Sequence, residues 1–192
     1  MLTLDQWNEI ERIWRRKLAQ DEAGLPLEVR HRNLEPASAE FIHALALGAS
    51  CLRLLEIGGS SGLSTIALAS AAKALNGRVT SLEKEPARQH ESKATIKRLG
   101  LSAHVEYVLG DATDFLAEAR EFDFVLIDCE KEDYARFFDM LRLPVGGIVV
   151  ADNILSHDLS AYTSHVRGLT GFESILLPIG KGLEVTKRSV PA

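Results

Sequence analysis

The stretch Leu52-Arg53-Leu54-Leu55-Glu56-Ile57-Gly58-Gly59-Ser60-Ser61-Gly62 decides the fold, because an apolar run passes through glycines directly into a helical pattern. Residues 52–57 have the aliphatic character of a buried strand, and residues 63–75 have the apolar spacing of a helix. The glycines allow a tight turn and let a ligand approach backbone amides where the helix begins. Strand, glycine turn and helix together predict a β/α unit.

The same alternation continues along the chain. Two helices are expected before the first strand, at 4–18 and 35–47. The expected strands are 52–57, 78–83, 105–109, 122–128 and 148–152, and the helices expected after them are 63–75, 86–99, 112–119, 134–143 and 157–169. Near-continuous apolar strands indicate burial on both faces, so we expect a parallel sheet with helices on both faces.

The end of the chain departs from this alternation. Residues 174–179 and 183–186 are strand-like, and Gly180-Lys181-Gly182 between them leaves no room for a helix. They should therefore pair as an antiparallel hairpin. The sequence predicts an α/β, Rossmann-like fold with a mostly parallel sheet and a C-terminal antiparallel hairpin. We expect one domain over 1–192, with an N-terminal helical segment at 1–48 and an α/β core at 49–192.

Composition narrows the class of protein. The chain has 192 residues, 46% of them hydrophobic and 26% charged, as in an ordinary globular domain. A net charge of -5 argues against a nucleic-acid partner, and no apolar run is long enough to span a membrane. The charged N-terminus lacks a signal-peptide core. Cys51 and Cys129 are expected to be buried thiols of a reducing compartment, so we expect a cytoplasmic protein.

Candidate ligand-binding residues follow the strands, where open α/β sheets bind their ligands. The first strand ends in Glu56 and the loop with Gly58, Ser60 and Gly62. Glu83 closes the second strand, where a carboxylate can accept hydrogen bonds from ribose hydroxyls. Asp111, followed by Ala112, is placed either to bind an adenine amino group or to cap the next helix. An acidic nucleoside site without a phosphate loop suits S-adenosylmethionine, which is cationic and carries no phosphate.

The glycine loop also fits other enzyme classes. Gly58 to Gly62 matches the G-x-S-x-G pattern of serine hydrolases, with Ser60 as nucleophile and His157 or His165 as base. That reading lacks an earlier strand-to-helix loop to supply an oxyanion donor. A dinucleotide fingerprint would need glycines where Ser60 and Leu63 stand, which disfavours an NAD-dependent oxidoreductase.

Oxygen ligands end the fourth and fifth strands. Asp128 closes one, and Asp152-Asn153 closes the next. On neighbouring parallel strands, two carboxylates and an amide oxygen would suit Mg²⁺, with Mn²⁺ and Ca²⁺ open as alternatives. Without a cation the two carboxylates would repel each other and raise a pKa. The competing interpretation makes Asp152-Asn153 a helix cap and Asp128 a turn residue.

Together these residues resemble the cation-dependent O-methyltransferases that include catechol and caffeoyl-coenzyme A O-methyltransferases. The resemblance spans about residues 35–188. The segments that carry it are Leu55-Glu56-Ile57-Gly58 through Gly62 with Ser64, then Glu83, then Phe124 to Asp128 with Lys131 and Tyr134, then Asp152-Asn153, and the ending Leu177-Pro178-Ile179-Gly180 with Gly182-Leu183. It implies a seven-stranded methyltransferase sheet whose reversed strand comes from the hairpin.

The resemblance also implies roles for individual residues. Cofactor binding is implied for Glu56, Gly58, Ser60, Gly62, Ser64, Glu83, Asp111, Ala112 and Asp128. Asp128, Asp152 and Asn153 would hold the metal. Lys131 and Asp128 would be catalytic, since a nearby lysine can accept or offset the proton of an acceptor hydroxyl whose oxyanion the metal stabilises.

The sequence therefore predicts an S-adenosylmethionine-dependent O-methyltransferase that acts on a small hydroxylated, catechol-like acceptor with a divalent cation. A metal-independent methyltransferase and a nucleoside-binding module without turnover are the alternatives. The family usually has an insertion after Asp152-Asn153 that is short here, so acceptor walls are expected from residues 30–34, Tyr134, residues 155–157 or a second subunit. The Trp7 and Trp14 helix should cover its own core or a second copy in a homodimer.

Overall fold

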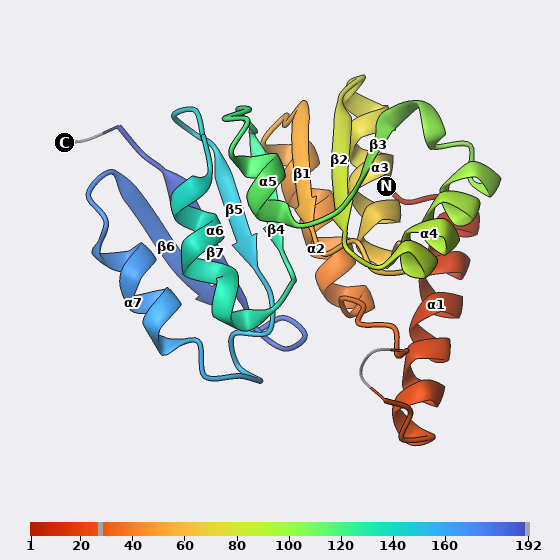
Figure 1. The fold of residues 1–192 in the computed structure, drawn as a ribbon. Coiled ribbons are helices and arrows are strands. Elements are labelled where there is room, and N and C mark those ends of the chain that lie inside the picture. The colour runs from red at the N-terminus through yellow and green to blue at the C-terminus, as the bar shows by residue number, and fades with distance from the viewer. Residues whose placement is uncertain (27–28, 191–192) are drawn as a thin grey trace.

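The computed structural model describes residues 1–26 and 29–190, which contain a seven-stranded sheet in the order β3-β2-β1-β4-β5-β7-β6 (Figure 1). The strands are β1 (Arg53–Ile57), β2 (Arg78–Glu83), β3 (Val105–Leu109), β4 (Phe124–Ile127), β5 (Ile148–Ala151), β6 (Phe172–Leu177) and β7 (Leu183–Arg188). The helices are α1 (Leu4–Glu22), α2 (Pro36–Gly48), α3 (Leu63–Leu75), α4 (Pro86–Arg98), α5 (Ala112–Leu116), α6 (Tyr134–Met140) and α7 (Ser160–Gly168), with 3-10 turns at Ser102–His104 and Lys131–Asp133.

The strand directions confirm the predicted sheet. β1, β2, β3, β4 and β5 pair in parallel, and β7 pairs antiparallel with both β5 and β6. The hairpin thus supplies the single reversed strand. Because β1 pairs with both β2 and β4, the ends of these three strands lie side by side, and the order of the strands reverses there. In such sheets this reversal is where ligands bind.

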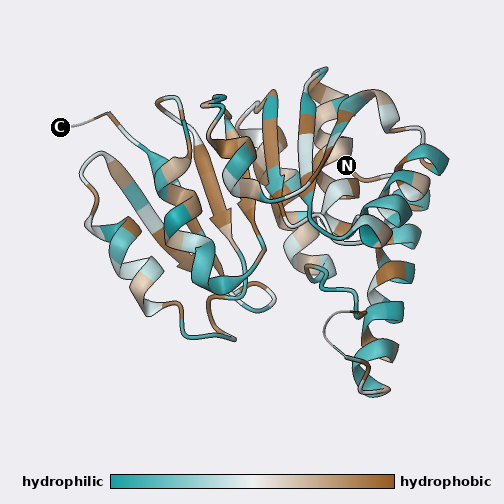
Figure 2. Ribbon diagram, in the orientation of Figure 1, coloured by the Kyte–Doolittle hydropathy of each residue, from teal (hydrophilic) through white to brown (hydrophobic). Residues whose placement is uncertain are grey.

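The sheet separates two hydrophobic cores, one on each face. The residues of a strand contribute to them alternately, because successive side chains point to opposite faces. Leu54, Phe124 and Val150 pack with α1, α2 and α3 on one face. Their neighbours Leu55 and Val125 pack with α5, α6 and α7 on the other. Figure 1 shows α6 in front of the strands and α3 behind them, and in Figure 2 β5 is brown along its length. The prediction of helices on both faces is confirmed.

Helix α1 covers the core of its own chain, as one of the two sequence alternatives proposed. It begins with a capping box between Thr3 and Gln6, which satisfies two backbone amides at its start. Trp7 and Trp14 pack against the same core as α2 and α3. No helix among the described residues is long and apolar enough to cross a membrane.

Several boundaries differ from the sequence expectations. Helix α7 begins at Ser160 instead of 157, because the Asp158 carboxylate accepts hydrogen bonds from the Ser160 backbone and hydroxyl just before the helix. Helix α5 ends at Leu116 instead of 119, and Ala119 lies in the left-handed region with φ 57°. Helix α6 ends at Met140, and β6 begins at Phe172, two residues before the expected start.

Candidate active site

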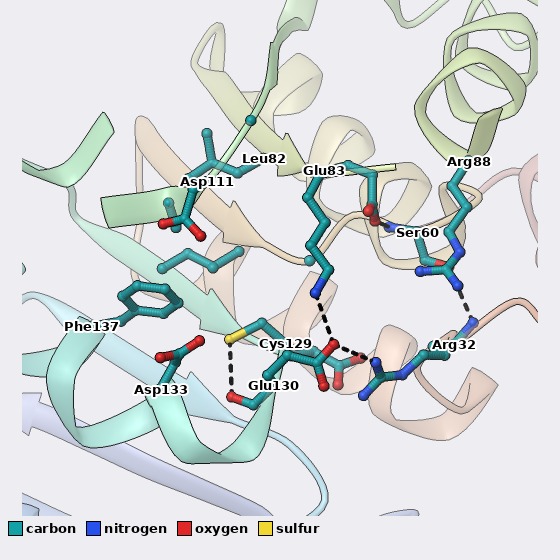
Figure 3. A pocket seen from close by; sticks show the side chains of 16 residues that line it. Arg32, Ser60, Leu82, Glu83, Arg88, Asp111, Cys129, Glu130, Asp133 and Phe137 are labelled. Atoms are coloured by element: carbon teal, nitrogen blue, oxygen red, sulfur yellow. Dashed lines mark hydrogen bonds and ion pairs between the residues drawn. The ribbon is translucent and has the colours of Figure 1, made fainter. Parts of the chain in front are cut away.

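A cavity of about 600 Å³, part of it continuous with solvent, lies at the carboxyl ends of β1, β2, β3 and β4 (Figure 3). Each of these strands contributes residues that the sequence singled out. The predicted cofactor residues that line it are Gly58, Ser60, Glu83, Asp111, Ala112 and Asp128. The structure therefore brings six of the nine predicted cofactor residues together around one cavity.

Gly58 lets the loop after β1 pass close to the end of β4. Its φ is +99°, and a Cβ atom built on it would lie 2.1 Å from the backbone oxygen of Asp128. Only a residue without a side chain permits both this backbone conformation and this approach. The glycine thus brings the β1 loop beside the residue that closes β4.

Glu83 is a buried carboxylate of the cavity that backbone amides hold in place. It is 6% exposed, and its two oxygens accept hydrogen bonds from the backbone amides of Ser60 (2.7 Å) and Glu85 (2.9 Å). Ser60 has a positive φ of 44°, and its hydroxyl accepts a hydrogen bond from the Arg32 amide at 3.2 Å. The carboxylate keeps further lone pairs for a ligand, because each oxygen can accept more than one hydrogen bond.

Asp111 caps the next helix, as one of its two sequence alternatives proposed, while binding of an adenine amino group stays a prediction. Its Oδ1 accepts the backbone amide of Thr113 at 2.7 Å, so it caps α5, and it also lines the cavity. The hydrogen bonds from Thr113 hold the pKa of Asp111 below its ordinary value. In Figure 3 Asp111 lies on the same side of the cavity as Phe137, opposite Glu83 and Ser60.

Glu56, Gly62 and Ser64 are not among the residues that line this cavity. The Glu56 carboxylate is completely buried behind the loop, where Ser81 (2.5 Å) and Thr65 (2.6 Å) donate to it. Burial raises its pKa, against the opposing effect of hydrogen bonds that include one from Ser64. A Cβ on Gly62 would lie 2.5 Å from the Ser92 hydroxyl. These contacts hold the loop, and direct cofactor binding by the three residues stays a prediction.

The three predicted metal ligands converge. Asn153 Nδ2 lies 2.9 Å from Asp128 Oδ1 and 2.9 Å from Asp152 Oδ2, so one amide group bridges the two carboxylates. Asp152 Oδ1 is buried without a hydrogen-bond partner among the described residues. Burial, reinforced by the charge of Asp128, raises the pKa of Asp152 to about 7. The cluster does not cap a helix, since α7 begins only at Ser160.

This donor set fits a divalent cation. An unpaired buried oxygen beside a second carboxylate is what a cation would satisfy, and hard oxygen ligands suit Mg²⁺. Asn153 would coordinate after its amide turns to present Oδ1, whose present contact with the Ser156 hydroxyl is a long one of 3.4 Å. A left-handed backbone at Asn153, with φ 69°, holds the side chain in this position.

Lys131 lies beside the same cluster. Its Nζ is 3.3 Å from Asp128 Oδ1 and donates to the Tyr134 hydroxyl at 2.7 Å. That hydroxyl in turn donates to the backbone oxygen of Asp152 at 3.2 Å. Burial raises the pKa of the Tyr134 hydroxyl well above its ordinary value. The hydroxyl therefore stays protonated and holds the Lys131 ammonium group in place as a neutral partner. The predicted catalytic residues Lys131 and Asp128 are therefore adjacent.

A second cavity, of about 840 Å³ with part of it open to solvent, lies on the other side of Asp128. Lys131 and Asn153 line it. Of the walls predicted at 30–34 and 155–157, residues 30–33 and His157 line it, and Leu34, Leu155 and Ser156 do not. The expectation that Tyr134 forms a wall was wrong, because this side chain is completely buried in the core. Asp128 and Arg32 line both cavities, so the two spaces meet at these residues.

Lys84 and Glu130 are site residues that the sequence did not single out, and both lie in contact with each other beside Arg32, which was expected only in the acceptor wall. Glu130 accepts hydrogen bonds from Arg32 at 2.7 Å, which Figure 3 shows, and from Lys84 at 3.0 Å. The contact with Arg32 is the main reason that the pKa of Glu130 falls to about 2. Arg32 lies 98 positions and Lys84 lies 46 positions from Glu130 along the chain, and no local sequence pattern predicts pairs at such separations.

The contacts of Ser60 do not support the serine hydrolase alternative, which needs a histidine as catalytic base. Among the described residues no histidine hydrogen bonds to Ser60: His157 contacts Ser156 and His165 pairs with Asp139. The cysteines are also poor nucleophiles. Cys51 is buried as expected, Cys129 is only half-buried in the cavity wall, and burial raises their pKa values to about 11 and about 12.

Comparison with known structures supports the fold. The S-adenosylhomocysteine-bound methyltransferase PaMTH1 of Podospora anserina matches with a TM-score of 0.81 and 19% identity, over 98% of this chain and 89% of that one. The O-methyltransferase TomG of Streptomyces achromogenes, in complex with S-adenosylmethionine, matches with a TM-score of 0.77 and 23% identity, over 93% and 89%. At these identities the likeness concerns the fold.

Sequence comparison identifies the family. A catechol O-methyltransferase of Niastella koreensis is 32% identical over 166 residues, which cover 81% of this chain and 73% of that protein. A catechol O-methyltransferase of Mycobacterium tuberculosis is 36% identical over 120 residues, covering 60% of this chain and 54% of that protein. The sequence model of the O-methyltransferase family matches residues 16–165, well over half of the chain. The chain therefore belongs to the O-methyltransferase family of S-adenosylmethionine-dependent enzymes.

Proposed function

We propose that this protein transfers a methyl group from S-adenosylmethionine to a hydroxyl of a small, catechol-like acceptor, assisted by a divalent cation. The observation that carries this proposal is the position of Asp128. It lines both cavities and stands beside Lys131 and Asn153. A methyl donor in one cavity and an acceptor in the other would then meet at a cluster of oxygen ligands. Relatives named catechol O-methyltransferases support the class of acceptor.

The first cavity has the chemistry of a nucleoside site. Glu83 presents a fixed carboxylate for ribose hydroxyls, and Asp111 offers an acceptor for an adenine amino group. Phe137, Ile57 and Leu82 give the cavity an apolar side for a flat base. The site needs no row of free backbone amides to bind phosphate, because S-adenosylmethionine carries no phosphate group. Its positive sulfonium suits a cavity that carries Glu83, Asp111 and Asp128 together.

The second cavity would orient the acceptor. When bound, the cation would lower the pKa of a coordinated hydroxyl and stabilise its oxyanion, with Asp128, Asp152 and Asn153 as the ligands. Lys131 is placed to offset that negative charge and to take up or pass on the hydroxyl proton. In the transfer the acceptor oxygen bonds to the methyl carbon, and the carbon–sulfur bond breaks to leave neutral S-adenosylhomocysteine. Positioning of the two reactants supplies much of the rate.

The experiment is a methyl-transfer assay with S-adenosylmethionine, Mg²⁺ and 3,4-dihydroxybenzyl alcohol, read by mass spectrometry of the product. We expect one O-methylated product, and much slower reaction of the 3-deoxy analogue, which lacks the vicinal pair. Equal rates for the diol and the monohydroxy compound would favour the metal-independent alternative. Binding of S-adenosylhomocysteine with no product would favour a nucleoside-binding module.

Glu83→Gln is expected to weaken the binding of S-adenosylhomocysteine about 10- to 100-fold, because the ribose hydroxyls would lose a charged acceptor. Isothermal titration calorimetry measures the change. Glu106→Gln, on β3 outside both cavities, is the matched control and should bind as the unmodified protein does. Chemical denaturation measures the free energy of unfolding of both variants and shows whether loss of the loop contacts made by Glu83 destabilises the fold. Unchanged affinity in folded Glu83→Gln would remove this residue from the site.

Divalent cation should stabilise the protein more at pH 8 than at pH 5.5. The pKa of Asp152 in the cation-free fold is about 7, well above its ordinary 3.8. A raised carboxyl pKa contributes stability that is present below pH 3.8 and is lost as pH rises towards 7, because the charged form is disfavoured in the fold. A cation removes that penalty, and below pH 7 it must displace a proton to bind.

Thermal unfolding with and without Mg²⁺ or Mn²⁺ measures this effect. The increase in Tm should be larger at pH 8, and Asp152→Asn should lose most of it at both pH values. The same increase at both pH values, or an undiminished increase in Asp152→Asn, would show that the cation binds elsewhere.

A further inference from the structure

The second cavity has a positive wall although the chain as a whole carries a net charge of -5. Five lysine or arginine side chains line it, against two aspartates. The cationic lining residues are Lys17, Arg30, Arg32, Lys131 and Lys181. In a partly enclosed space, the part of this excess that neighbouring carboxylates do not offset raises the local concentration of anions.

Some of these cations already have partners within the fold. Lys131 lies beside Asp128, and Arg32 pairs with Glu130. Lys17 contacts Asp21 at 2.6 Å. Their charges are thus largely offset by neighbouring carboxylates, and they do not by themselves call for a ligand.

Other polar atoms in the same wall have no partner. Lys181, in the turn between β6 and β7, makes no side-chain hydrogen bond or ion pair with any described residue, and its charge acts at longer range on the Asp152 carboxyl. Arg30 shares Asp21 with Lys17, and its Nε is buried without a partner among the residues described. His31 is 6% exposed, and its Nδ1 is likewise buried without a hydrogen-bond partner among the described residues. Lys181 and Arg30 are therefore the cations of this wall whose charge the fold compensates least, and charged groups of this kind bind anions.

We propose that this cavity selects acceptors that carry an anionic group, a carboxylate or a phosphonate-like group, a short distance from their hydroxyls. This inference rests on the proposed function and specifies its acceptor. The hydroxyls lie at the Asp128 and Asn153 end, and the anion binds Lys181 and Arg30 in the positive wall. Both groups can donate charge-assisted hydrogen bonds to an anion. An acceptor with an ammonium group in the same place is disfavoured by this wall.

A matched series of acceptors tests the proposal. The compounds are 3,4-dihydroxyphenylacetate, 3,4-dihydroxybenzylphosphonate, 3,4-dihydroxybenzyl alcohol and 3,4-dihydroxybenzylamine, which share the ring and one methylene spacer and differ in charge. Steady-state rates are measured at pH 8 with saturating S-adenosylmethionine and Mg²⁺. We expect kcat/KM to be about tenfold higher for one or both anions than for the alcohol, and lowest for the amine. The two anions distinguish carboxylate from phosphonate recognition.

Three variants connect the preference to the wall. Lys181→Met should lower the ratio of kcat/KM between the preferred anion and the alcohol about tenfold, and Lys181→Arg should restore that ratio. Lys187→Met, an exposed lysine on β7 outside the cavity, is the control and should leave the ratio unchanged. Equal kcat/KM for alcohol and anions, or a preference that survives in Lys181→Met, would overturn the proposal.

Ligand binding separates this inference from the proposed function. The affinity of 3,4-dihydroxyphenylacetate and of the alcohol is measured by calorimetry in the presence of S-adenosylhomocysteine and Mg²⁺. Tighter binding of the anion that is lost in Lys181→Met supports the anion site even if no acceptor is methylated, in which case only the proposed function fails. Turnover of the series with no charge preference in rate or binding overturns the anion site alone.

Discussion

Asp152→Ala is expected to lower kcat for a catechol-like acceptor about a thousandfold or more while leaving the affinity for S-adenosylhomocysteine within about twofold. Asp152 belongs to the convergent oxygen cluster and is not among the residues that line the cofactor cavity. Loss of one ligand removes stabilisation of the acceptor oxyanion that is worth several kcal/mol, and each 1.4 kcal/mol is about a factor of ten in rate.

The matched control is Asp139→Ala, an exposed carboxylate on α6 whose partner is His165. It should retain the rate of the unmodified protein. Rapid-quench kinetics for the transfer step and calorimetry for the cofactor product separate the two effects. A parallel loss of S-adenosylhomocysteine affinity would show that Asp152 supports the cofactor cavity instead.

Gly58→Ala is expected to lower the free energy of unfolding by about 3 kcal/mol or more and to abolish cofactor binding in the protein that still folds. The new Cβ would lie 2.1 Å from the Asp128 backbone oxygen, on a residue with φ +99°. The positive φ alone costs an alanine about 1–2 kcal/mol, and the overlap with backbone must be relieved by moving the loop or β4.

Gly48→Ala provides the comparison. Gly48 is the last residue of α2, its φ is not in the left-handed range, and no atom lies within 4 Å of a Cβ built there. It should be neutral or slightly stabilising, because alanine favours the helix. Urea denaturation of both variants measures the difference. Equal stability of the two would mean that the close approach of the β1 loop to β4 is unimportant.

The order of elements and the ends of the strands could be predicted from sequence because both depend on local patterns. Continuous apolar runs such as 124–127 mark buried parallel strands, and glycines mark the turn after β1. Parallel strands bring their carboxyl ends to one edge, which placed Glu83, Asp128 and Asp152 near a common site. The reversed strand followed from a three-residue connection too short for a crossover.

Other features depend on tertiary contacts that no local pattern encodes. Arg32 reaches Glu130 across 98 positions, so the meeting of the two cavities at Arg32 was not predictable. The glycine-loop motif did not distinguish residues facing the cavity from those behind it, and Glu56 is completely buried. Tyr134 was expected in a wall, but its side chain is buried in the core, and both its hydroxyl and the face of its ring contact the Lys131 ammonium group.

The most direct test of the account is methyl transfer to a vicinal diol under control of the divalent cation. The rate with S-adenosylmethionine and 3,4-dihydroxybenzyl alcohol is measured first with excess chelator and then after Mg²⁺ or Mn²⁺ is added beyond the chelator. We expect almost no product in chelator and recovery of the rate with the cation. Full activity in excess chelator would contradict the proposed function, because the cluster of Asp128, Asp152 and Asn153 would then have no metal-dependent role.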